Sequence, residues 1–412
     1  GSGADDRSIV YETTPASGSS PPVTMLQIQS SAPDLSNVTL SAPSATINAA
    51  DVSAFSNLTA TASGTVTGGG LLEAGLAATI IGSALSLEAV TAGTDAVLTA
   101  TLGGVTATGA IAAGHDVTVT APGDIAAAEV DAGDDVLLSA GGAISAGAAF
   151  AYGSGADDEG NGSNVVATAS GAILFDGDIS SANDTTLTGA SIAAQAIDAG
   201  GGILLTATGG GGGAIAVSDA AAGGYFGATG QSVSFTSIDA GAVSLTAVGG
   251  AITGGTITAG DEVQLTGASI TVTSVEGDAS LNAQATAGAI AIAEANVAGF
   301  VDVAATGAIS GAYTAGGDIA LTTPGAINAS VNALGGYEDP GTDAIAAGNA
   351  YLDAGGNVTL ANSSAAGMLG INAGGSVTVT GAAAGEDALV IAGTTANLAD
   401  LSAGDDIDVR AG

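Results

Sequence analysis

The sequence predicts an all-β protein, a parallel β-helix solenoid in which short strands wind into coils of about 19 residues. Three observations predict this fold: a phrase that recurs at a nearly constant interval, alternation of apolar and polar residues within each phrase, and turn-forming residues between phrases. A single strand–turn–strand unit of this length cannot bury its own apolar face. Similar units must therefore stack on one another, which pairs each strand with the coils above and below it.

The recurring phrase has the form Ala-Gly-x-Asp-Val-x-Leu-Thr. Its copies include AGHDVTVTA, AGDDVLLSA, AGDEVQLTG and AGGSVTVTG, and a shorter Gly-x-Ile phrase lies between them. The glycine of the longer phrase falls at Gly93, Gly114 and Gly133 in one stretch and at Gly241 and Gly260 in another, with spacings of 21, 19 and 19 residues. Each repeat is therefore expected to hold two strands and two turns.

The alternation within the phrase assigns side chains to the two faces of a strand. Val117 and Val119 alternate with Thr118 and Thr120, a period of two that is typical of a strand with one buried face. We expect the valines to face the core and the threonines to face solvent. Gly, Asn and Asp are expected in the turns, for positive φ angles or for side-chain hydrogen bonds to the backbone. No helical periodicity is present, so α-helix should be nearly absent.

Composition excludes several classes of function. The 412 residues include 40 acidic residues but only two basic ones, Arg7 and Arg410, for a formal net charge of −38. Nucleic-acid binding depends on Lys and Arg, so no nucleic-acid partner is expected. No run of 18 apolar residues occurs, so no membrane insertion by this segment is expected. The positive mean hydropathy, +0.50, indicates an ordered core of small side chains rather than a disordered chain.

Catalysis is not expected either. His115 is the only histidine and occupies the variable third position of its phrase, where we expect an ordinary turn residue. The chain has no Cys and no Lys, which removes the thiol and amine nucleophiles. The acids are dispersed mainly as Asp in turns, without a marked carboxylate pair. The sequence therefore predicts no enzyme, no catalytic residue and no cofactor.

The repeats divide the chain into an extended linker or arm over 1–25, rich in Pro, Ser and Gly, and a β-helix over 26–412. Insertions are expected near 149–164, 223–232 and 334–353. Loops that leave a solenoid are frequent binding surfaces. Their aromatic residues are our contact candidates: Tyr152, Tyr225, Phe226, Tyr337 and Tyr351.

Acidic residues cluster in the first insertion. Asp157, Asp158 and Glu159 gather oxygen ligands of the kind that Ca²⁺ prefers, and are the candidate calcium site. The phrase GSGADD occurs there and again at the first residue of the sequence. We therefore expect the chain to be a segment of a longer polypeptide.

The repeated phrase, with Gly-x-Ile between its copies, resembles the repeats of filamentous haemagglutinin-like exoproteins. The resemblance covers roughly 38–412 and is most literal at 90–140, 238–330 and 352–412. It implies a right-handed parallel β-helix, export by two-partner secretion, and a location outside a bacterial cell or on its surface. It further implies a structural or adhesive fibre whose partners are receptors or glycans on host or neighbouring cells.

Two other functions are compatible with the same repeats. Strand edges at the ends of a solenoid can template self-association, which is typical of a self-assembling filament or sheath subunit. The outward threonines, such as Thr118 and Thr120, form a regular face that could instead bind ice or carbohydrate.

Overall fold

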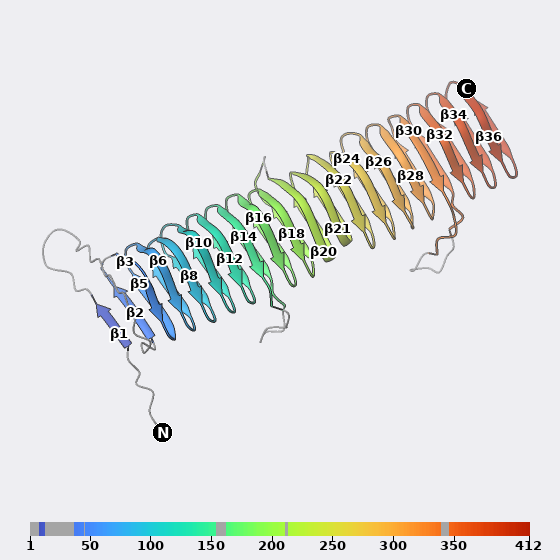
Figure 1. Ribbon diagram of the computed structural model, residues 1–412. Helices are drawn as coiled ribbons and strands as arrows, with labels where there is room; N and C mark the ends of the chain where they lie inside the picture. The colour runs from blue at the N-terminus through green and yellow to red at the C-terminus, as the bar shows by residue number, and fades with distance from the viewer. Residues whose placement is uncertain (1–7, 13–36, 45, 154–161, 211–212, 339–345) are drawn as a thin grey trace. The chain divides into compact units, whose positions relative to one another are not determined.

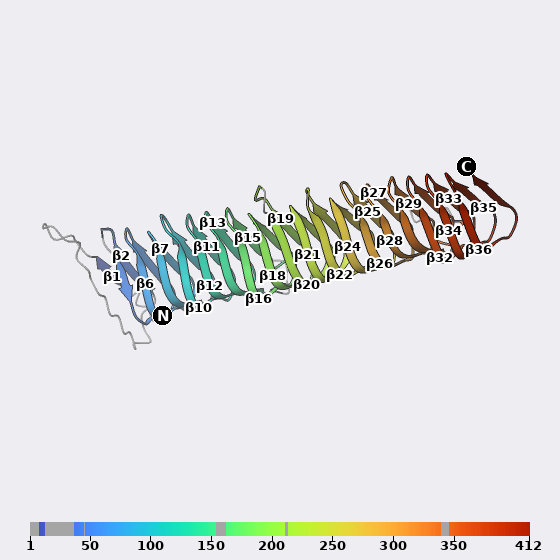
Figure 2. The same cartoon turned by 90° about the horizontal axis from the view of Figure 1, so that it is seen from above.

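A computed structural model describes residues 8–12, 37–44, 46–153, 162–210, 213–338 and 346–412. All regular elements in these ranges are β-strands, and neighbouring coils pair in parallel about 19 residues apart. The predicted all-β parallel solenoid is therefore confirmed. The chain forms two compact units, 1–213 and 214–412, and Figures 1 and 2 show the strands of each unit as successive coils.

Unit 1 contains two families of strands, one of short strands and one of longer strands. The short family consists of β1 (Ser8–Glu12), β2 (Asn37–Ala42), β5 (Asn57–Ala62), β7 (Ala78–Gly82), β9 (Ala96–Ala100), β11 (Val117–Ala121), β13 (Val136–Ala140), β15 (Val165–Ala169), β17 (Thr185–Gly189) and β19 (Ile203–Ala207). The longer family consists of β6 (Val66–Ala74), β8 (Leu85–Ala92), β10 (Val105–Ala113), β12 (Ile125–Ala132), β14 (Ile144–Ala151), β16 (Ile173–Ser181) and β18 (Ile192–Ala199), with β3 (Ile47–Ala49) and β4 (Val52–Ala54) as two separate pieces.

Unit 2 contains the same two families, and in its first two strands they are fused: β20 (Ala214–Gly230) and β21 (Ser232–Ala247). The longer strands are then β22 (Ala251–Ala259), β24 (Ser269–Gly277), β26 (Ile290–Val297), β28 (Ile309–Ala315), β30 (Ile327–Ala333), β32 (Val358–Ala365), β34 (Val377–Ala384) and β36 (Ala396–Ala403). The short strands are β23 (Val263–Gly267), β25 (Leu281–Ala285), β27 (Val301–Ala305), β29 (Ile319–Thr323), β31 (Ala350–Ala354), β33 (Leu369–Ala373), β35 (Ala388–Ala392) and β37 (Ile407–Ala411).

Each coil has three faces, because the longer strand turns a corner at its middle. In β12 the alternation of buried and outward residues is interrupted by two consecutive exposed residues, Ala128 and Glu129. The pairing of β10 with β12 shifts register at the same place, between Ala107 and Ala110. The two pieces β3 and β4 pair with the two ends of β6, so in that coil the corner separates the strands completely. The short strand supplies the third face.

The core is built from columns of inward side chains, one from each coil. Val119 lies in register between Leu98 and Leu138, and all three are fully buried. Burying an aliphatic side chain of this size contributes about 1.5–3 kcal/mol. Larger residues are accommodated beside small ones: Phe175, only 1% exposed, lies in register between two alanines, Ala146 and Ala194. The columns thus keep a nearly constant width.

Tyr313 is the largest fully buried side chain in the described ranges. Its hydroxyl donates a hydrogen bond to the carbonyl oxygen of Ser310 at 3.1 Å, which satisfies the polar end of the ring. Burial raises the pKa of Tyr313 well above its ordinary value, so the ring remains neutral in the folded chain. Tyr313 is therefore a core residue and not a surface residue.

The glycine of the repeated phrase is required by close contact between coils. A Cβ atom added to Gly133 would lie 2.0 Å from the carbonyl oxygen of Gly114, and one added to Gly114 would lie 2.2 Å from that of Gly93. None of these three glycines has a positive φ, so the expected conformational reason does not apply to them. A glycine is needed here because the backbones of successive turns stack too closely for any side chain.

This contact predicts a large difference between two Gly→Ala substitutions in unit 1. Gly133→Ala is expected to destabilise the unit by about 1–3 kcal/mol, as overpacking does, because the backbone oxygen of Gly114 cannot move without separating the coils. Gly210→Ala is the matched control, since a Cβ there meets no atom within 4 Å. Thermal unfolding followed by circular dichroism measures both. Equal melting temperatures would contradict the proposed role of the glycine.

Two of the three predicted insertion regions contain extra residues in the structure, and the third does not. Partners in successive coils are 29 residues apart across 149–164 and 31 residues apart across 334–353, so these coils hold extra residues. Residues 223–232 contain no insertion: they lie within β20 and at the start of β21, and their partners are 17 or 18 residues away. Gly223 and Gly224 allow a compact corner at which the strand continues without a protruding turn.

The expected linker over 1–25 lies mostly outside the described residues. Within it, Ser8–Glu12 forms strand β1, which pairs in parallel with β2. This part of the segment therefore adds a strand to unit 1.

Candidate functional site

The aspartates of the repeated phrase form a continuous column at the turn that follows each longer strand. In this turn ladder of unit 1, each side-chain oxygen accepts the backbone N–H of the next member of the column. The members are Asp95, Asp116, Asp135, Asn164 and Asp184, and the last bond of the column goes to the N–H of Gly202. The donor–acceptor distances run from 3.5 Å at Asp95 to 2.7 Å at Asp184. Asp387 and Asp406 repeat the contact in unit 2 at 3.1 Å.

The ladder explains why Asp recurs in many of the repeats despite the large negative charge. Charges one coil apart, about 4.8 Å, repel by about 1 kcal/mol in water. A hydrogen bond to an ionised acceptor contributes about 1.5–3 kcal/mol, which outweighs that repulsion. Asn at the same position keeps the acceptor without the charge, as Asn164 does. The main role of the carboxylate at this position is therefore to stabilise the turn, and the negative surface charge is a consequence.

The ladder predicts that its members tolerate Asn but not Ala. Asp184→Ala should destabilise unit 1 by about 1 kcal/mol, because the N–H of Gly202 loses its acceptor. Asp184→Asn should change the stability by less than about 0.5 kcal/mol. Hydrogen exchange at the Gly202 amide reports the bond directly. Faster exchange in both variants, or in neither, would contradict the assignment of this carboxylate as the acceptor.

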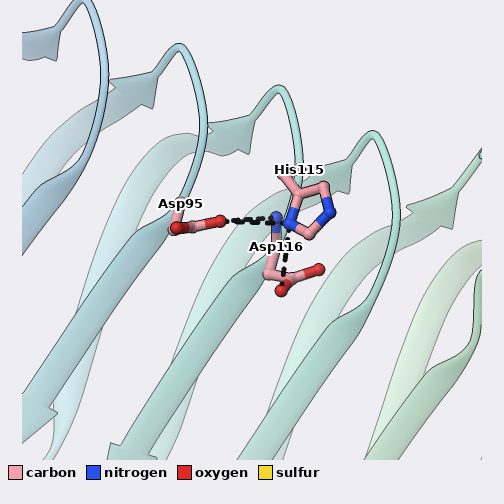
Figure 3. A group of neighbouring side chains, drawn as sticks. All are labelled: Asp95, His115 and Asp116. Carbon is pink, nitrogen blue, oxygen red and sulfur yellow. Dashed lines mark hydrogen bonds and ion pairs between the residues drawn. The ribbon is translucent and has the colours of Figure 1, made fainter. Parts of the chain in front are cut away.

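His115 lies within this ladder and contacts carboxylates of three successive coils. Its Nδ1 atom is 3.2 Å from Oδ1 of Asp95 in the preceding coil and 3.2 Å from Oδ2 of Asp116 in its own coil. Its Nε2 atom is 3.5 Å from Oδ2 of Asp134 in the following coil. Figure 3 shows Asp95 and Asp116 on the Nδ1 side of the ring. We call Asp95, His115, Asp116 and Asp134 the histidine cluster.

The cluster contains more acceptors than donors. The other oxygen of Asp116 already accepts the N–H of Asp135 at 3.1 Å, which fixes the carboxylate with Oδ2 toward His115. Asp134 is largely buried, and the hydroxyl of Ser163 lies 2.9 Å from its Oδ1. Partial burial lowers the pKa of His115, but the charges of Asp116, Asp95 and Asp134 outweigh it and raise the pKa above 6.5. The cluster therefore favours a positive charge at the imidazole.

The sequence assigned His115 only to a turn, and it did not identify this cluster. Asp95, Asp116 and Asp134 are separated by 21 and 18 residues, and they meet because the coils stack. The available signal was that they hold the third or fourth position of the same phrase in three consecutive repeats. The candidate calcium ligands Asp157, Asp158 and Glu159 lie outside the described residues.

The five aromatic contact candidates differ in exposure and in the elements that hold them. Tyr152 is 57% exposed and stacks on Phe150, with ring centroids 5.4 Å apart. Tyr225 and Tyr351 are also exposed but lie on strands β20 and β31, not on loops. Each of these two rings lies close to a glycine, Gly227 and Gly370 respectively.

The other two candidates, Tyr337 and Phe226, pack against neighbouring side chains. Tyr337 is half-buried and meets Phe300 edge to face at 5.2 Å. Phe226 is 1% exposed and pairs in register with the buried Val243, so its expected place on an exposed loop is wrong. It faces inward because Tyr225 and Phe226 are consecutive residues of a strand, whose side chains point to opposite faces.

Unit 2 has a hollow of about 490 Å³ along the compact corners that begin at Ala222 and Gly223. It is lined by small residues, including Gly241 and Gly260, and by the acidic residues Asp239, Glu276 and Asp278. The carboxylates can accept hydrogen bonds from a ligand rich in hydroxyl groups.

Comparison with known proteins gives no relative from which a function could be transferred. A scan against protein-family models, a search of curated proteins and a search of solved structures each returned no match. Within the described ranges, no helix has the length and apolarity that a membrane crossing requires.

Proposed function

We propose that the chain is a segment of an extracellular structural and adhesive fibre of the filamentous haemagglutinin-like kind, located outside a bacterial cell or on its surface. The observation that carries this proposal is the coil-on-coil pairing within each unit, in which nearly every inward position is aliphatic. Such a scaffold extends by adding repeats, since each coil contacts mainly its neighbours. Its outward positions are then available for contacts with other molecules.

Two features of the outer surface support the adhesive part of the proposal. Tyr152, Tyr225 and Tyr351 are exposed on a scaffold that holds them in fixed positions, and exposed aromatic rings are enriched at binding surfaces. The hollow beside Asp239 and Glu276 adds hydrogen-bond acceptors at a surface with small side chains. Rings and acceptors together suit receptors or glycans on other cells.

The adhesive role is tested with beads that carry the purified chain. Coated beads should bind to cells or to a glycan array, and Tyr152→Ala combined with Tyr225→Ala and Tyr351→Ala should reduce binding by about tenfold or more. Leu102→Ala is the control, because Leu102 is 79% exposed and is not a contact candidate. Coated beads that bind no better than bare beads would contradict adhesion by this segment.

The same preparation distinguishes the filament subunit from the adhesin. A self-assembling subunit gives polymers in electron micrographs whose length grows with protein concentration, whereas an adhesive segment remains dispersed and binds its target. Ice or carbohydrate binding by outward threonines instead predicts that Thr118→Val with Thr120→Val abolishes inhibition of ice growth or binding to the array.

A further inference from the structure

The histidine cluster contains one ring nitrogen that faces two carboxylate oxygens. Nδ1 of His115 lies 3.2 Å from Oδ1 of Asp95 and 3.2 Å from Oδ2 of Asp116. Asp95, His115 and Asp116 each offer one ligand atom, and these atoms lie within 4.8 Å of one another. A tetrahedral metal ion with bonds of about 2.1 Å to N and O ligands separates neighbouring ligand atoms by about 3.4 Å. The two distances at Nδ1 are already close to that value.

Asp134 lies opposite the second nitrogen of the ring. Its Oδ2 lies 3.5 Å from Nε2 of His115, and its side chain is only 10% exposed. This largely buried carboxylate can accept a proton on Nε2, whereas Asp95 and Asp116 compete for a proton on Nδ1. In the neutral tautomer that carries its proton on Nε2, the lone pair lies on Nδ1, which is the ligand form. A carboxylate behind the second ring nitrogen is the arrangement that commonly orients histidine ligands of metal ions.

In that tautomer, three electron-pair donors converge without a hydrogen atom between them. Nδ1 and both carboxylate oxygens are acceptors, and the sequence contains no lysine that could lie among them. A proton on Nδ1 can be shared with one carboxylate at a time, whereas a divalent cation binds all three donors at once. We propose that Asp95, His115 and Asp116 bind a divalent transition-metal ion of the Zn²⁺ class, with Asp134 as the positioning residue.

The ligand set points to this class of ion. Imidazole nitrogen with carboxylate oxygen suits Zn²⁺ and similar ions, whereas Ca²⁺ and Mg²⁺ prefer sites of oxygen ligands alone. The side chains of Asp95, His115 and Asp116 are 39–50% exposed, so an ion has direct access and the remaining positions go to water. Asp95 belongs to one coil and the other two ligands to the next. The ion therefore clamps two successive turns of the ladder.

The single histidine makes the test specific. Chelator-treated protein labelled with ¹⁵N at histidine gives one pair of ring-nitrogen signals, and it is titrated with Zn²⁺ in excess Mg²⁺, which occupies the other carboxylates. One equivalent of Zn²⁺ should shift the Nδ1 signal strongly and leave Nε2 protonated. Zn²⁺ should also raise the melting temperature of the protein but not that of His115→Gln. A titration that leaves the histidine signals unchanged would overturn the proposal.

Variants separate this site from general attraction to a negative surface. His115→Gln should abolish the one-equivalent binding measured by calorimetry. Asp116→Asn should weaken it by at least about tenfold, and Asp134→Asn by about 10–100-fold, as loss of outer-shell partners does. Asp387→Asn is the matched control, since it removes one charge from a turn ladder position in unit 2. Equal weakening by Asp387→Asn would show binding by net charge alone and would refute the site.

Discussion

Val119→Asp is expected to unfold the coils around β11. The side chain of Val119 is fully buried, and its neighbours in the column are Leu98 and Leu138. An aspartate there would have no described partner that could neutralise its charge, and an unpaired buried charge costs several kcal/mol. Because coils depend on their neighbours, the loss should spread to the adjacent strands β9 and β13. Limited proteolysis with elastase measures it, because cleavage is expected to appear in β9–β13 only in the variant.

The adjacent outward position provides the control. Thr120 is exposed on the same strand, so Thr120→Asp should change the stability by less than about 0.5 kcal/mol and leave the proteolysis pattern unchanged. Comparing Val119→Asp with Thr120→Asp separates the effect of burying the aspartate from the effect of adding one negative charge. If both variants were equally resistant, or equally sensitive, the assignment of faces in β11 would be wrong.

Phe175→Ala is expected to destabilise unit 1 by about 3–5 kcal/mol. The ring is 1% exposed, and its neighbours in the column, Ala146 and Ala194, are too short to fill the space that it leaves. Apolar cavities of this kind relax only partly, so both the transfer free energy and the packing contacts are lost. Thermal unfolding of the variant should show a clearly lower melting temperature than the parent chain.

A second substitution tests whether the column as a whole requires one large residue. Phe175→Ala combined with Ala194→Phe moves the ring by one coil, and it should recover part of the lost stability. Ala194→Phe alone should be destabilising, because two rings would then lie one above the other. No recovery in the double variant would show that the site of Phe175 is specific and that the column does not share its volume between coils.

The solenoid could be predicted from the sequence because its signals are local. Four consecutive residues are enough to assign the two faces of a strand, as in Val117-Thr-Val-Thr, and the glycines of the phrase give the length of the repeat. Neither signal requires knowledge of which coil lies next to which. The three-faced coil was not predicted, because the corner at Ala128 and Glu129 involves no turn residue. The residues on each side of this corner alternate as in a strand, so the sequence predicts a single strand there.

Features that depend on stacking were missed or misinterpreted. The turn glycines were expected to need positive φ, whereas Gly133 is required by the oxygen of Gly114 in the coil before it. Residues 223–232 looked irregular, but two glycines simply shorten a corner there and Phe226 enters the core. Of the three carboxylates near His115, Asp116 follows it in the sequence, whereas Asp95 and Asp134 come near it only because the coils stack. In each case the relevant contact joins residues about 19 positions apart.

Disulfide formation tests the central claim, that successive repeats stack in register as coils, most directly. The chain has no cysteine, so two can be introduced without background. Thr118 and Leu137 are paired outward residues of β11 and β13, whose Cα atoms should lie about 4.8 Å apart, within disulfide range. Thr118→Cys with Leu137→Cys should therefore oxidise rapidly within one chain. Thr118→Cys with Ser139→Cys, offset by two residues and about 8 Å, should not. Equal oxidation of both pairs, or of the offset pair alone, would contradict the stacked solenoid.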